Sequence, residues 1–119
     1  MARHDQLLEF LGEMAEQFGH FRVVAINQSI SSPGSSPISE IIADESDNEI
    51  CLIRAASDQA FLNLDTFYMN LRGILDRYPE HSLMVSEWFQ IDDEHTGRAD
   101  VPLKNVEVDE DSNEFRLLY

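Results

Sequence analysis

Two amphipathic stretches of helical period, separated by short runs of apolar and β-branched residues, constrain the fold of this chain most. In residues 5–18 the apolar side chains recur along one continuous helical face, and Gly19 follows as a natural stop. A second stretch, which Ser57 or Asp58 can cap, runs to Pro79, where the proline ends a helix. Its apolar face comprises Phe61, Leu64, Phe67, Tyr68, Leu71, Ile74, Leu75 and Tyr78.

Runs rich in β-branched and apolar residues follow each predicted helix and indicate strands. Ser31–Pro37 is typical of a surface connection, and Thr96-Gly97 is expected to close a turn in which the glycine supplies a positive φ. The chain therefore predicts one α+β domain over residues 1–119, of order αβββαβββ, with an antiparallel sheet and two helices packed on one face. The expected strands are 21–30, 38–43, 49–55, 83–91, 98–108 and 114–119.

The net charge limits the partners that the chain can bind. Twenty-three acids and eight bases give a charge of −15. Such a surface repels nucleic acid phosphates and anionic membranes, and it attracts basic proteins and cations. Solubility in a saline environment explains the same charge, since Lys104 is the single lysine among the bases, and both interpretations stay open.

The remaining composition indicates a reduced compartment. Residues 1–5 have no apolar signal core, and no apolar run reaches membrane-spanning length. Cys51 lies in an apolar, strand-like run, so we expect a buried and unreactive thiol. We predict a cytoplasmic protein.

Three acidic clusters, which begin at Asp44, Asp92 and Asp109, invite a test for calcium. A helix-loop-helix calcium loop needs oxygen ligands at positions 1, 3 and 5, glycine at 6 and glutamate at 12, and none of the clusters completes this pattern. The four histidines show no spacing typical of zinc. We predict no metal and no cofactor. Asp92–Arg98 is better interpreted as a hairpin turn with an acidic tip.

Glu87 is the one carboxylate that strand alternation places on an apolar face. It shares that face with Leu83 and Val85. Burial would raise its pKa and suit it to general acid–base chemistry. An ion pair with Arg22 or Arg54 is the simpler interpretation, and we assign no catalytic residue.

At the level of architecture, the chain resembles type III secretion chaperones, which are small acidic proteins of αβββαββ order. That resemblance implies a dimer that holds an unfolded segment of a partner. The chain lacks the third helix that ends the chaperone fold, and no site residue is transferred from it.

Three functions follow as hypotheses. The first is a non-enzymatic interaction protein that binds a basic protein, as a chaperone, an inhibitor or an immunity protein would. The second is a small-molecule binding domain with a pocket between helices and sheet, to which we assign Phe67, Tyr68, Glu87 and Trp88. The third is an enzyme that uses Glu87 or the acids near His95.

Several predicted strands are apolar on both faces, which predicts a homodimer. Two helices cover one face of a sheet, so the other face would leave Met84 and Trp88 exposed as an interface. A second subunit is the simplest cover for it. The competing cover is the Ser31–Pro37 connection.

Overall fold

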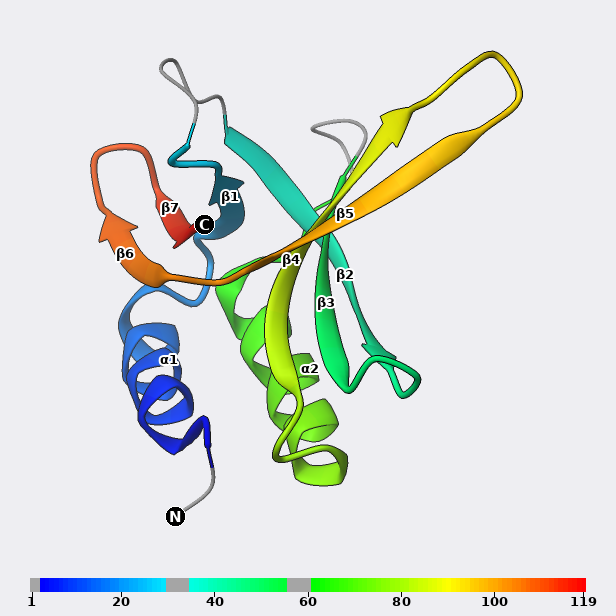
Figure 1. Ribbon diagram of the computed structural model, residues 1–119. Coiled ribbons are helices and arrows are strands. Elements are labelled where there is room, and N and C mark those ends of the chain that lie inside the picture. The colour runs from blue at the N-terminus through cyan, green and yellow to red at the C-terminus, as the bar shows by residue number, and fades with distance from the viewer. Residues whose placement is uncertain (1–2, 30–34, 56–60) are drawn as a thin grey trace.

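The computed structural model describes residues 3–29, 35–55 and 61–119, apart from the side chains of Phe89 and Gln90, and these residues form two helices and seven strands, an α+β fold (Figure 1). The first helix spans the predicted residues 5–18, and the expected hairpin of residues 38–55 is present. In chain order the elements are α1 (Asp5–Phe18), β1 (Arg22–Ile26), β2 (Ser35–Asp44), β3 (Glu49–Arg54), α2 (Leu64–Arg77), β4 (Ser82–Gln90), β5 (Thr96–Pro102), β6 (Asn105–Asp109) and β7 (Glu114–Leu118).

The seven strands form one mixed sheet of order β5-β4-β3-β2-β1-β7-β6. The prediction of an antiparallel sheet is wrong for two pairs, because β3 runs parallel to β4 and β1 runs parallel to β7. Helix α2 connects β3 to β4 and returns the chain to the starting end of the sheet, so the next strand must run in the same direction.

The predicted strand 98–108 is two strands at opposite edges of the sheet. β5 pairs with β4, β6 pairs with β7, and only Leu103 and Lys104 separate them. The Leu103 amide donates to the Leu83 carbonyl at 3.1 Å, and the Lys104 amide donates to the Leu118 carbonyl at 2.9 Å. The sheet therefore curls until its two edges meet at this link, which we call the seam.

Side chains from one face of the sheet form the core with the helices. α2 contributes Leu64, Phe67, Leu71 and Leu75, and α1 contributes Leu11. Phe10 of α1 reaches β7, where its ring lies 6.2 Å from that of Phe115. The helices cover this face only in part, because the outer halves of β4 and β5 project beyond them (Figure 1). The strands contribute Val23, Ala25, Ile38, Ile50, Leu52, Leu83, Val85, Phe115 and Leu117.

Helix α2 begins later than the sequence predicts. Asn63 is its N-cap, and the Asn63 side chain accepts a hydrogen bond from the Thr66 amide at 2.9 Å. Phe61 precedes the helix and is half-exposed, while the expected caps Ser57 and Asp58 lie outside the described residues. Backbone pairing sets the first residue of α2. The Leu64 amide donates to the Phe21 carbonyl, so the chain just before the helix is hydrogen-bonded to the segment that leads into β1.

The predicted connection Ser31–Pro37 is in part a strand. Ser35–Pro37 open β2 and pair with β1, where Val24 lies opposite Pro37. Residues 31–34 lie outside the described residues, so whether they cover a sheet face stays a prediction.

Candidate functional site

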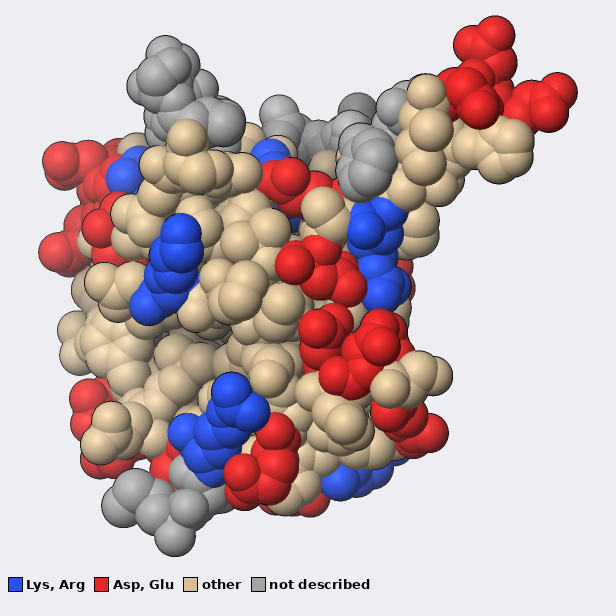
Figure 2. All heavy atoms as spheres, in the orientation of Figure 1, with Lys and Arg blue, Asp and Glu red and all other residues tan. Residues whose placement is uncertain are grey.

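The outer halves of β4 and β5 form a hairpin that projects from the body, and we call residues 88–98 the arm (Figure 1). Trp88 pairs with Arg98 at its base, and Gln90 pairs with Thr96 near its tip. Two large apolar side chains face solvent here, since Trp88 is 57% exposed and Ile91 is 62% exposed. Acidic side chains gather at the projecting end (Figure 2).

Hydrogen bonds fix the turn at the tip of the arm. The Asp92 carboxylate accepts from the backbone amides of Glu94 and His95, each at 2.9 Å, and its Oδ1 lies 2.8 Å from Nδ1 of His95. The bond from the Glu94 amide is the main reason that the pKa of Asp92 is lowered. The predicted hairpin turn is confirmed. The expected positive φ of Gly97 is wrong, because Gly97 lies within β5 and the positive φ values belong to Asn48 and Asn113 at other turns.

Glu87 lies just inside the arm, on the side of the sheet that faces the helices. Its carboxylate pairs with Arg54, one of the two arginines that the sequence offered. The Tyr119 hydroxyl donates to the same carboxylate oxygen, and Arg54 also reaches Tyr119 and Ser36. Burial and the hydrogen bond to Glu87 raise the pKa of Tyr119. Because two donors already engage the carboxylate, the cluster has the character of a structural ion pair rather than of an acid–base site.

The four residues predicted to line one pocket are not brought together. Glu87 and Trp88 share a small cavity of about 290 Å³ with Arg54 and Ser36. Phe67 is buried in the core and fills the space in which the pocket was expected. Tyr68 packs between the helices, where a side chain at Gly12 would lie 3.0 Å from its hydroxyl oxygen.

The sheet face opposite the helices is partly covered within the single chain. Arg98 of β5 lies 3.1 Å from Asp100 and 3.2 Å from Asp44 of β2, so its side chain crosses the intervening strands. Cys51 and Ser86, on the strands between, have no exposed surface, and burial raises the pKa of the Cys51 thiol. Met84 is also buried, so of the two predicted interface residues only Trp88 is available to a partner.

A group of carboxylates lies beside this layer, and it includes the acidic cluster that begins at Asp44. Among the described residues, Glu49, Cys51 and Asp100 each bring one possible metal-ligand atom within 4.8 Å of the others, and Asp44, Asp47 and Glu49 do the same. Burial, and then the nearby Asp100, raise the pKa of Glu49. Asp44, Asp47 and Glu49 lie at the turn between β2 and β3, and the sheet adds Asp100 of β5 to them.

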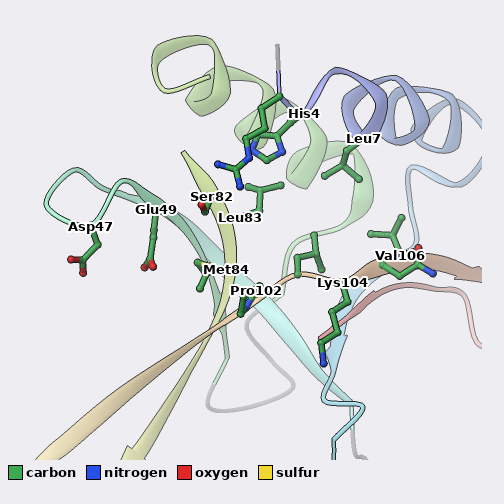
Figure 3. Close-up of a pocket in the computed structure, with 13 residues that line it drawn as sticks. His4, Leu7, Asp47, Glu49, Ser82, Leu83, Met84, Pro102, Lys104 and Val106 are labelled. Atoms are coloured by element: carbon green, nitrogen blue, oxygen red, sulfur yellow. Dashed lines mark hydrogen bonds between the residues drawn. The ribbon is translucent and has the colours of Figure 1, made fainter. Parts of the chain in front are cut away.

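A cleft of about 540 Å³ lies at the seam. The segment that leads into α1, the start of β4 and the link between β5 and β6 form its walls (Figure 3). The cleft cannot be predicted from sequence patterns, because the residues that line it belong to four separate stretches of the chain.

No family model matches the chain, and neither a curated protein nor a solved structure shows significant similarity to it. None of the described helices is long and apolar enough to cross a membrane. The function therefore has to be argued from the geometry of the chain itself.

Proposed function

We propose that the chain is a non-enzymatic interaction protein that binds a protein with a basic surface, and that the arm is the element that makes the contact. The observation that carries this proposal is the combination of exposed Trp88 and Ile91 with an acidic tip on one projecting hairpin. A few buried residues, tryptophan prominent among them, supply most of the affinity in protein interfaces, and surrounding charges supply orientation and rate.

Charge complementarity decides which kind of partner fits the arm. The arm contains Asp92, Asp93 and Glu94, and its one base, Arg98, is paired with Asp44 and Asp100. The whole chain carries a charge of −15, so long-range attraction also favours a basic partner. A rigid tip lowers the entropy that is lost on binding, and the hydrogen bonds of Asp92 provide that rigidity.

A homodimer remains a weaker proposal for the same arm. The homodimer was predicted because the sheet face opposite the helices was expected to be apolar and exposed. Much of that face is covered by Arg98 and its carboxylate partners. Two copies that each carry a charge of −15 also repel each other. Light scattering coupled to size exclusion separates the two cases, since a mass of 13.6 kDa at micromolar concentration excludes the dimer.

The arm can be tested with a labelled peptide of alternating arginine and leucine. Trp88 is the single tryptophan, so its emission reports contact at the arm directly. We expect binding at low salt, a shift of the Trp88 emission, and about threefold to tenfold weaker binding when Asp93→Asn and Glu94→Gln are combined. Ile91→Ser should weaken binding at high salt as well, because its contribution is apolar.

Glu9→Gln combined with Glu13→Gln is the matched control, since both side chains are exposed on α1 and the change in net charge is the same. An acidic peptide of alternating glutamate and leucine should not bind. Equal loss of affinity in the α1 control and in the arm variant would show that only net charge acts, and the arm would then be excluded as the contact.

A further inference from the structure

The cleft at the seam carries unneutralised charge of both signs. Asp47 and Glu49 lie at one end of it, Lys104 and Val106 lie at the other, and Met84 and Pro102 lie between them (Figure 3). No ion pair joins the acidic end to Lys104 or Arg3 among the described residues. The charges at the two ends of the cleft therefore do not neutralise each other.

The acidic end is short of positive charge. Asp44, Asp47, Glu49 and Asp100 lie close together, and Arg98 pairs with two of them, Asp44 and Asp100. The raised pKa of Glu49 has the proximity of Asp100 and Asp47 among its causes, after burial. A ligand ammonium at this end would neutralise charge that the chain leaves uncompensated.

The other end is short of negative charge, which is unusual in a chain with a net charge of −15. Lys104 is exposed and takes part in no ion pair of the described residues. Arg3, which also lines the cleft, donates to the backbone carbonyl of Glu80 at 3.1 Å and not to a carboxylate. A ligand carboxylate at this end would find Lys104, a cation that has no acidic partner among the described residues.

The middle of the cleft is apolar and the volume is that of a small-molecule site. Leu7, Leu83 and Leu103 line it together with Met84 and Pro102. Ligand sites usually enclose roughly 300–1,000 Å³ with a mainly apolar lining and a few polar groups. A volume of about 540 Å³ leaves room for a ligand longer than one amino acid.

We propose that the seam cleft binds a short apolar peptide with free ends, of two or three residues, whose ammonium lies at Asp47 and Glu49 and whose carboxylate lies at Lys104. The apolar side chains of the peptide then rest on Met84, Pro102 and the leucines. This site is separate from the arm, and it does not depend on the function proposed above.

Leucyl-leucine is the first probe, with N-acetyl-leucyl-leucine and leucyl-leucine amide as analogues that lack one charge each. By calorimetry we expect leucyl-leucine to bind with a dissociation constant of about 0.1–1 mM, the range that its size allows. Each analogue should bind about tenfold more weakly. Backbone amide shifts in NMR spectra should move at residues 82–84 and 103–106 and not in the arm.

Two variants connect each end of the ligand to its residue. Lys104→Gln should weaken leucyl-leucine about tenfold and leave the amide analogue unchanged. Asp47→Asn should weaken leucyl-leucine and leave the acetylated analogue unchanged. The controls Arg77→Gln and Glu13→Gln change the same charges on exposed positions outside the cleft and should have no effect.

Three results would overturn the proposal: no binding of leucyl-leucine at about 10 mM, which is far above the expected constant; equal binding of all three peptides; or amide shifts confined to the arm. The variant with Asp93→Asn and Glu94→Gln should keep its affinity for leucyl-leucine, and Lys104→Gln should still bind the arginine-leucine peptide. Failure of one proposal is thereby distinguished from failure of the other.

Discussion

Glu49 shows at the scale of one residue what assembly of the sheet does to a carboxyl group. Its Oε2 atom is buried without a hydrogen-bond partner among the described residues, and its pKa is raised, first by burial. A carboxyl group whose folded pKa is raised stabilises the fold only while it is protonated. That contribution is present below the unfolded pKa, about 4.3 for glutamate, and is lost as the pH rises through the folded value.

Glu49→Gln should therefore raise the melting temperature at pH 7, because the glutamine carries no charge to bury. The gain over the unsubstituted protein should shrink towards zero as the pH falls below about 4. Circular dichroism melts of both proteins across this range test the prediction. Glu13→Gln on the exposed face of α1 should show no such pH-dependent gain, and a loss of stability in Glu49→Gln at every pH would contradict the proposed cause.

Glu87 and Arg54 form the half-buried pair on the helix-facing side of the sheet. Removing one partner leaves the other charge partly desolvated, so Glu87→Gln should cost about 1–3 kcal/mol of unfolding free energy. Replacing both residues, with Arg54→Met and Glu87→Leu, should cost less than the sum of the two single replacements. Urea unfolding of the four proteins of this cycle measures the coupling, and simple additivity would show that the pair does not interact.

At the scale of elements, the start of α2 depends on local capping and on pairing with distant strands. Asn63 caps the helix, and Arg22 forms an isolated bridge with the same residue. The apolar periodicity of the sequence extends back to Phe61, which is why the predicted start comes too early. Periodicity therefore identifies the helix, and the sheet contact decides where it begins.

Asn63→Ala should lower the free energy of unfolding by about 1 kcal/mol, because the Thr66 amide loses its acceptor. Asn63→Asp keeps an acceptor and places a negative charge at a helix N-terminus, so its stability should stay near that of the unsubstituted protein. Urea denaturation with a constant slope measures both. If the alanine variant were as stable as the aspartate variant, the cap would contribute nothing.

At the scale of the whole molecule, the net negative charge opposes folding, and ion pairs neutralise it at only a few sites. Among the described residues, Arg54, Arg98 and Arg116 form ion pairs with carboxylates. Arg116 by itself pairs with three of them. These arginines are few against twenty-three acids. Self-repulsion should thus remain substantial in the folded chain.

Raising monovalent salt from about 10 mM to about 500 mM should raise the melting temperature, since screening weakens repulsion between acids more than it weakens the few ion pairs. Scanning calorimetry at constant pH measures the change. A neutral osmolyte at equal osmolality controls for effects other than screening. A melting temperature that falls with salt would show that the ion pairs outweigh the repulsion.

Local features of the sequence determined the first helix, the hairpin of residues 38–55, the acidic turn at Asp92 and the face on which Glu87 lies. Each depends on periodicity or on turn chemistry within a few neighbouring residues, and both can be recognised from the local sequence. Arg54 was one of two arginines that the sequence could not separate. Tyr119 and Ser36 were missed as its partners, because nothing local relates them to Glu87.

Only the tertiary structure decided the strand order, the two parallel pairs, the split of residues 98–108 and the cleft at the seam. A strand carries no local sign of which neighbour it will join, since that choice minimises exposed apolar surface over the whole sheet. Arg98 illustrates the same point, because it covers Cys51 and Ser86 only after β5 and β2 enter one sheet. The sequence specified the elements, and their long-range packing created the surfaces that can bind a partner.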